Sequence, residues 1–346
     1  MTSGPYIDIR DLASPVRTSS SCPVSGCSAN LERANSQWGE LPYCPQHRIR
    51  IHATTRTFVY YDGPDRASKR DAALRNILFE RDYFSAHILG NAAKAETHRI
   101  CHETSEDALS WNVFSRLARG RLLRLLFPTL ALSSPSNDPE LFMWGLRVNL
   151  NDSSAPTLFP ALRSARNVFE KDITRFWTEP DIMLYVPGQW LVLIEAKFTQ
   201  RNTIASSSSD RDVSGDKPKS REGLLRRYAA DALPPGAMRT DGLNQTPFYS
   251  QLYRNLVFAI HMATELGVSW GLVNLVCGKQ FRQQANFQDP TPFIHELLPE
   301  KSRGQFLFYN WESLYANDVV KNADLKDLAS YMCNKSANGV KAFDIE

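Results

Sequence analysis

The stretch EPDIMLYVPGQWLVLIEAKF, residues 179–198, decides the predicted fold. It reads as two apolar strands joined by a tight turn at residues 187–189, where a proline and a glycine favour chain reversal. Three ionisable residues, Asp181, Glu195 and Lys197, interrupt otherwise apolar runs. Charged groups inside a buried hairpin are costly unless they are paired or bind a metal, so these three are candidates for a functional site.

The register of this hairpin determines whether the three side chains meet. If Val186 pairs with Trp190 across a three-residue loop, Asp181 lies opposite Glu195, and Glu195 and Lys197 share one face. A two-residue loop would shift the pairing by one residue. Carboxylate oxygens suit a hard cation such as Mg²⁺, and a nearby lysine can orient water or offset charge on a phosphate. The alternative is a single structural ion pair between Glu195 and Lys197.

At these residues the chain resembles the PD-(D/E)xK nuclease superfamily, which has the restriction-endonuclease-like fold. Pro180-Asp181 matches the PD half of the motif, and Glu195-Ala196-Lys197 matches the (D/E)xK half. The resemblance covers roughly residues 100–320 and implies an α/β fold with a mixed central β-sheet flanked by helices. It also implies a metal-dependent DNA endonuclease, with restriction or antiviral defence as its setting. In that role Asp181 and Glu195 bind Mg²⁺ (or Mn²⁺), and Lys197 positions the attacking hydroxide.

A helix is predicted directly after Glu103, because Thr104 and Asp107 form a capping-box pattern. Glu106 lies in the first turn of this helix. The resemblance implies that Glu106 joins the metal site, with Glu103 as the alternative carboxylate. An acidic residue at a helix start also complements the helix dipole, which would require no further role. The chain from Leu141 to Leu150 is then predicted as one strand.

A later helix is predicted to begin at Thr246-Pro247 and to end at about Leu266, before a glycine. The resemblance makes two residues of this helix candidates for reaching the scissile phosphate. Gln251 is the catalytic candidate, and Arg254 is the DNA-binding one. The alternative for both is an ordinary role on the helix surface.

Residues 199–245, between the hairpin and this helix, differ in composition from their surroundings. A serine run and many charged residues predict a mobile basic insertion. A flexible basic segment after the catalytic strand is suited to following a nucleic-acid backbone, whereas the alternative is a solubilising loop. The DNA-binding candidates of this segment are Lys217, Lys219, Arg221, Arg226 and Arg227.

Cysteine and histidine spacing near the start of the chain predicts a structural zinc site. Cys22 and Cys27 form a C-x4-C pair, and Cys44 and His47 follow as C-x2-H. Two such knuckles provide four tetrahedral ligands, and zinc would supply folding energy that this polar segment lacks. His52 is an alternative fourth ligand, and free or buried cysteines are the alternative to a metal. Such a module either contacts nucleic acid or only braces a terminus.

The chain has 346 residues, of which 42% are hydrophobic, and a formal net charge of +3. This is enough apolar content for a substantial core, while the charge is too small to indicate a partner. No apolar run is long enough for a membrane span, no signal pattern opens the chain, and the cysteine usage favours a reducing compartment. A cytoplasmic protein is therefore predicted. Its expected parts are a flexible terminus (1–20), a zinc module (21–60) and a nuclease-like domain (61–346).

Other enzyme classes lack their motifs in this sequence. There is no G-x-G-x-x-G after a strand, no G-K-[ST] and no G-x-S-x-G. DNA is the predicted partner, no membrane partner is expected, and a homodimer is left open. Two rival functions remain. One is a nucleic-acid-binding or signalling protein on a catalytically inactive nuclease-like fold, and the other is a structural subunit whose zinc module docks a partner protein.

Overall fold

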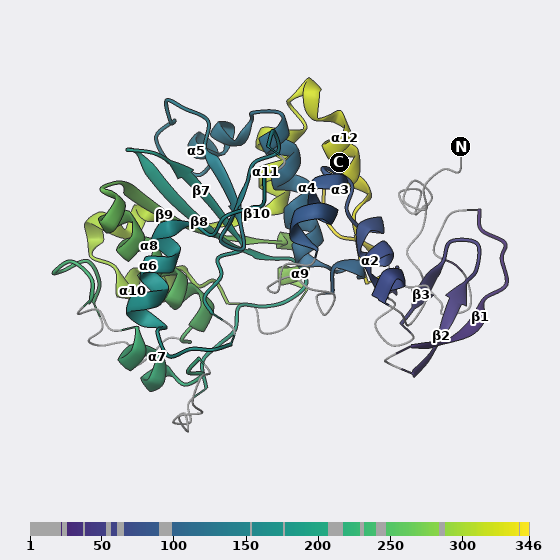
Figure 1. The fold of residues 1–346 in the computed structure, drawn as a ribbon, viewed down its shortest axis with the longest axis horizontal. Helices are drawn as coiled ribbons and strands as arrows, with labels where there is room; N and C mark the ends of the chain where they lie inside the picture. Colours follow the sequence, from purple (N-terminus) through teal and green to yellow (C-terminus); the bar gives the residue numbers. More distant parts are fainter. Residues whose placement is uncertain are drawn as a thin grey trace.

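The centre of the protein, in a computed structural model, is a six-stranded mixed sheet with the order β10-β9-β8-β7-β5-β6 (Figure 1). The parallel strands are β8 (Trp190–Lys197), β9 (Ser269–Val276) and β10 (Phe306–Asn310). The antiparallel ones are β5 (Glu140–Met143), β6 (Leu146–Val148) and β7 (Ile182–Val186). The structure describes residues 22, 26–36, 39–52, 57–60, 66–89, 99–152, 154–175, 177–206, 217–228, 232–239, 247–283, 288–338 and 340–345.

Two helical layers cover the two faces of this sheet (Figure 1). Side chains alternate along β8, so Val192 and Ile194 join one apolar core and Leu191 and Leu193 join the other. The first core is closed by α4 (Glu106–Arg119), α5 (Leu126–Thr129), α11 (Trp311–Leu314) and α12 (Lys326–Asn334). The second is closed by α6 (Pro160–Phe169), α7 (Arg221–Arg227), α8 (Ser250–Leu266) and α10 (Thr291–Leu297). The predicted mixed sheet flanked by helices is confirmed.

A small antiparallel sheet, which contains Cys44, lies at one end of the molecule (Figure 1, purple). Its strands are β1 (Glu32–Ser36), β2 (Gly39–Cys44), β3 (Ile49–Ile51) and β4 (Phe58–Val59). The remaining helices are α2 (Arg66–Arg75), α3 (Arg81–Tyr83) and α9 (Gly278–Arg282), and a two-stranded ribbon comprises β11 (Ser336–Ala337) and β12 (Val340–Lys341). Short turns of 3-10 or π geometry occupy Phe84–Ile88, Arg99–Cys101, Leu123–Leu125, Glu300–Gln305, Tyr315–Val319 and Ala323–Leu325. Within the described ranges, no helix is both long and apolar enough to cross a membrane.

Backbone hydrogen bonds join this small sheet to the segment that leads into α4. The amide of Tyr60 donates to the carbonyl of Cys101 at 2.9 Å, and the amide of Glu103 donates to the carbonyl of Phe58 at 3.0 Å. The guanidinium of Arg75 adds donors to the backbone carbonyls of the turn that contains His47. Main-chain hydrogen bonds therefore connect the cysteine-bearing sheet to the start of α4.

Three local predictions are wrong. Helix α8 begins at Ser250, with Tyr249 as its cap, and not at Pro247. The single strand predicted from Leu141 to Leu150 is a hairpin, because Trp144 and Gly145 have φ angles of +53° and +82° and reverse the chain between β5 and β6. The sequence lacks the Asn-Gly or Asp-Gly pair that usually signals this turn. The cap of α4 is Ser105 rather than Thr104, and its hydroxyl accepts from the amide of Ala108 at 3.1 Å.

Gly145→Ala is expected to destabilise the fold more than Gly188→Ala. Both glycines have positive φ, but a Cβ at Gly145 lies 2.5 Å from Cδ2 of Leu162, whereas a Cβ at Gly188 has no atom within 4 Å. The control Gly188→Ala should cost about 1 kcal/mol from backbone strain alone. Gly145→Ala should cost about 3 kcal/mol because overpacking is added. Urea unfolding measures both, and equal losses would contradict the close packing of this turn against α6.

Candidate functional site

The β7–β8 hairpin has the register that brings the candidate acids together. Val186 pairs with Trp190 and Ile182 pairs with Ile194, so the three-residue loop is confirmed. The next step along the hairpin places Asp181 opposite Glu195. One oxygen of the Asp181 carboxylate accepts from the amide of Ala196 at 2.9 Å, which fixes this side chain beside β8.

Lys197 lies between two carboxylates from different elements. Its Nζ is 2.5 Å from Oε1 of Glu195 and 3.5 Å from Oε1 of Glu106. The second oxygen of Glu106 accepts from the amide of Phe198 at 2.8 Å, so the first turn of α4 is bonded to the end of β8. Glu195 is 2% exposed and Lys197 is 4% exposed. Asp181 and Glu106 are half-buried, so they form the more open side of the cluster.

The charges of this cluster are strongly interdependent. Burial alone lowers the pKa of Lys197, but the carboxylates of Glu106, Glu195 and Asp181 together raise it well above its usual value. Burial raises the pKa of Glu106, and the ammonium of Lys197 opposes that change. Three carboxylates around one ammonium leave a formal excess of two negative charges. One divalent cation would neutralise this excess.

The carboxylates converge on Lys197 and are not gathered into a compact cage. Among the described residues, the Cys/His cluster alone brings three or more such ligand atoms within 4.8 Å of one another. Glu103, the alternative carboxylate, is 1% exposed and accepts from the amide of Phe58 at 3.3 Å. It therefore faces the small N-terminal sheet, and Glu106 is the glutamate that reaches Lys197.

The two candidates on α8 make local contacts instead of reaching the acids. The Gln251 carbonyl oxygen accepts from the hydroxyl of Thr203 at 3.2 Å, and Arg254 Nε donates to the carbonyl of Ser250 at 3.2 Å. The residue of α8 that contacts the cluster is Asn255, whose Nδ2 donates to Oε2 of Glu195 at 2.7 Å. The sequence analysis assigned no role to Asn255. A polar amide within an otherwise apolar part of a helix nevertheless indicates a buried hydrogen-bond partner.

The basic candidates lie on and beside α7, within the insertion predicted at 199–245. Arg227 is paired with Asp172 through two hydrogen bonds of 2.5 and 2.9 Å, and the Arg221 guanidinium lies 5.8 Å from the centre of the Phe248 ring. Lys217 is half-buried, and burial beside Arg254 lowers its pKa to about 7. Lys219 and Arg226 are exposed. Residues 207–216, 229–231 and 240–245 of the insertion, the terminus at 1–20 and the helix-start candidate Thr246 lie outside the described residues.

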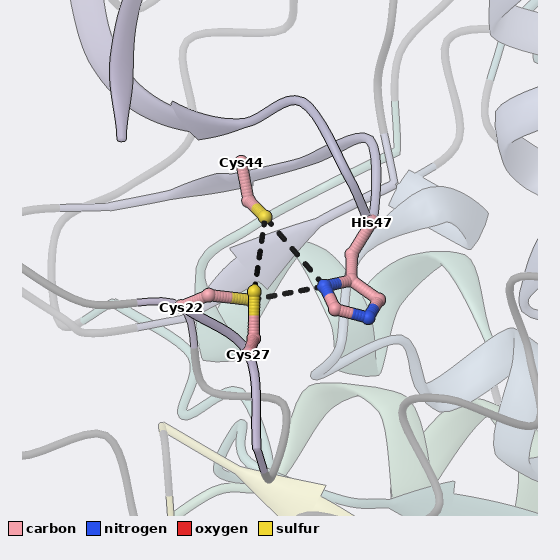
Figure 2. Close-up of side chains that lie close together, drawn as sticks. All are labelled: Cys22, Cys27, Cys44 and His47. Carbon is pink, nitrogen blue, oxygen red and sulfur yellow. Dashed lines mark hydrogen bonds between the residues drawn. The ribbon is translucent and has the colours of Figure 1, made fainter. Parts of the chain in front are cut away.

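The four predicted zinc ligands form a compact cluster (Figure 2). Nδ1 of His47 lies 3.4 Å from Sγ of Cys22 and 3.6 Å from Sγ of Cys44, and the sulfurs of Cys27 and Cys44 are 3.8 Å apart. A tetrahedral zinc ion with ordinary bond lengths requires about 3.8 Å between sulfurs and about 3.6 Å between sulfur and nitrogen. The spacing therefore fits zinc, and His52 is not among the four residues.

Local structure explains how the chain presents these ligands. Gly26 has a φ of +73° in the first knuckle, and the amide of Arg48 donates to the carbonyl of Cys44 at 2.7 Å in the second. Cys44 is 0% exposed and His47 is 5% exposed. Burial raises the pKa of the Cys44 thiol, so a cation is needed to keep it as the thiolate ligand that zinc prefers.

Comparisons of the chain with protein-family models, with curated proteins and with solved structures found no match. The similarity to the PD-(D/E)xK superfamily therefore depends on the motif residues alone. Their arrangement in the β7–β8 hairpin and the first turn of α4 is the basis for the function proposed below.

Cys44→Ala is expected to lose bound zinc and to loosen the start of α4. Bound zinc would supply free energy that stabilises the small sheet, and β4 is bonded to the segment before α4. Zinc content by mass spectrometry should fall by one ion per chain, and hydrogen exchange at the amide of Glu103 should accelerate. The control is Cys333→Ala, a cysteine outside the cluster. Unchanged zinc content in Cys44→Ala would refute this ligand set.

The contribution of Lys335 to the stability of the protein is expected to increase with pH. This side chain is 7% exposed, its Nζ donates to the carbonyl of Glu103 at 2.5 Å, and burial lowers its pKa to about 8 from 10.5. Between these two values this lysine binds more protons in the unfolded chain than in the folded one, so its contribution to the free energy of unfolding rises across this window. Lys335→Met should remove about 3 kcal/mol of that rise.

Urea unfolding at pH 7.5 and at pH 10 measures this difference. The exposed Lys301 provides the control variant, Lys301→Met, which should keep the wild-type pH dependence. The same pH dependence in Lys335→Met and in the wild type would show that Lys335 is not desolvated as the structure places it.

Proposed function

We propose that this protein is a Mg²⁺-dependent (or Mn²⁺-dependent) nuclease that hydrolyses phosphodiester bonds of DNA. The observation that carries the proposal is the convergence of Asp181, Glu195 and Glu106 around the ammonium of Lys197. These residues come from a strand pair and a helix that are far apart in sequence. The formal excess of two negative charges matches one divalent cation, and carboxylate oxygens are the ligands that Mg²⁺ prefers.

Each residue of the cluster has a role that its contacts support. Asp181 and Glu195 would hold the cation, with Glu106 assisting, and the bound ion would supply Lewis-acid stabilisation of charge on the phosphate. Lys197 keeps its proton, so it can donate to an attacking hydroxide or to a phosphate oxygen. Water would attack phosphorus in line, so that the P–O3′ bond breaks as the new P–O bond forms, and the proton lost by the water would end on the leaving 3′ oxygen. The half-buried Asp181 and Glu106 form the side from which a phosphate approaches.

The second candidate function is nucleic-acid binding or signalling on an inactive nuclease-like fold. The near-complete burial of Glu195 and Lys197 favours it, since a reacting phosphate must reach both groups. In both proposals the Cys/His cluster binds a structural zinc ion that stabilises the N-terminal sheet. Restriction or antiviral defence is the setting that the superfamily resemblance adds to the first proposal.

Lys197→Met is expected to reduce cleavage of plasmid DNA in the presence of Mg²⁺ by a hundredfold or more, because the donor to the phosphate or hydroxide is lost. The matched control is Lys335→Met, since Lys335 is a second buried lysine but its ammonium bonds to the carbonyl of Glu103 and not to the acids. Circular dichroism must show that both variants are folded, because the change at Lys197 leaves buried carboxylates without their cation.

Equal cleavage by the wild type and by Lys197→Met would remove the proposed mechanism. The second candidate function would be supported by a different result. That result is DNA binding by the wild type, undiminished in Asp181→Ala, together with no cleavage under Mg²⁺ or Mn²⁺.

A further inference from the structure

Asn255 contacts the most deeply buried acid of the cluster. It lies in the middle of α8, is 3% exposed, and donates from Nδ2 to Oε2 of Glu195 at 2.7 Å. The other oxygen of Glu195 accepts from the ammonium of Lys197. Each oxygen of this carboxylate therefore has its own donor on a different element, and together the two bonds fix the orientation of the carboxylate.

Two more buried asparagines hold the backbone at the same point. Asn274 of β9 pairs with Glu195 in the sheet, and its Nδ2 donates to the Glu195 carbonyl at 3.2 Å. Asn202 follows β8 and donates to Oδ1 of Asn274 at 2.7 Å. Asn274 is 0% exposed and Asn202 is 6% exposed. The side chain and the carbonyl of Glu195 thus both accept hydrogen bonds from asparagine amides.

A buried amide at position 255 destabilises the fold unless it forms a hydrogen bond with Glu195. The neighbouring Leu252, Leu256 and Ala259 are 0% exposed and belong to the apolar core beneath the sheet. A buried amide without a partner costs about 1–3 kcal/mol, so an apolar residue would pack here at lower cost if Glu195 were not present. The amide is also neutral. It can hold one oxygen of a carboxylate without cancelling the charge that attracts a cation.

We infer that Asn255 is a positioning residue that orients Glu195 for binding a divalent cation, an inference that rests on the proposed function. The hydrogen bond from Asn255 occupies Oε2 of Glu195. The other oxygen, Oε1, becomes available to a cation when Lys197 donates to a phosphate or hydroxide oxygen instead. Removing a hydrogen-bond donor that holds a metal-binding carboxylate typically changes metal affinity by ten- to a hundredfold. Gln251 and Arg254, which were expected to act from this helix, make no such contact among the described residues.

The test uses the zinc-loaded full chain with Mn²⁺ alone as the probe, measured by calorimetry, and Mg²⁺ activation of plasmid cleavage as the second readout. Asn255→Leu removes the donor and keeps a side chain that branches at Cγ. Asn255→Ser shortens the side chain so that it cannot reach Oε2, and serves if the leucine variant fails to fold. Both should bind Mn²⁺ at least tenfold more weakly and need correspondingly more Mg²⁺ for half-maximal cleavage. Glu195→Gln assigns the titrated site, because it should abolish this binding.

The matched control is Asn112→Leu. Asn112 is 0% exposed, and its amide donates to the carbonyl of Asn76 at 3.0 Å and to the hydroxyl of Tyr331 at 3.1 Å. Its loss should destabilise the fold without changing Mn²⁺ affinity. An equal loss of affinity in this variant would show a general effect of stability and overturn the inference.

The remaining outcomes separate the inference from the proposed function. Wild-type Mn²⁺ affinity in both Asn255 variants, with cleavage by the wild type, would overturn the role of Asn255 and leave the nuclease standing. Mn²⁺ binding that weakens in the variants without any cleavage would support the positioning role and refute the nuclease. A wild type that binds no Mn²⁺ would overturn both.

Discussion

The ammonium of Lys197 lies between the carboxylates of Glu195 and Glu106 at the end of the central strand β8. Removing one ammonium and its carboxylates from water costs several kcal/mol per ion, and apolar residues of similar volume would often be as stable. This desolvation cost is offset because nearly every carboxylate oxygen of the cluster accepts a hydrogen bond. Asp181 and Glu106 accept from backbone amides beside β8, and Glu195 accepts from Asn255.

The same cluster links the two helical layers and the N-terminal sheet. Asn255 reaches β8 from the layer that contains α8, whereas Glu106 reaches it from α4 on the opposite face. The segment before α4 is bonded to β4 of the cysteine-bearing sheet. Cys44 of the Cys/His cluster lies in β2, and β3 and β4 lie between β2 and the segment that precedes Glu106. This connection favours a bracing role for the zinc module.

Sequence reasoning succeeded where the decisive interactions are local. The register at Val186 and Trp190 follows from a short loop and from side-chain alternation, so the approach of Asp181 to Glu195 was predictable. The spacing of the cysteines and the histidine likewise predicted the four residues that form the Cys/His cluster. The prediction from sequence failed at Trp144 and Gly145, because this turn lacks the residues that usually signal a hairpin. There the Trp144 indole donates to Asp107, and the turn packs against Leu162.

The sequence by itself determined the mixed sheet flanked by helices, the hairpin and the identity of its charged residues, because alternation and turn chemistry act within a few residues. Only the tertiary structure decided which helical residues reach that hairpin. It selected Glu106 over Glu103 and Asn255 over Gln251. The physical reason is that these choices depend on how α4 and α8 are rotated and set against the sheet, and packing between distant segments fixes that rotation.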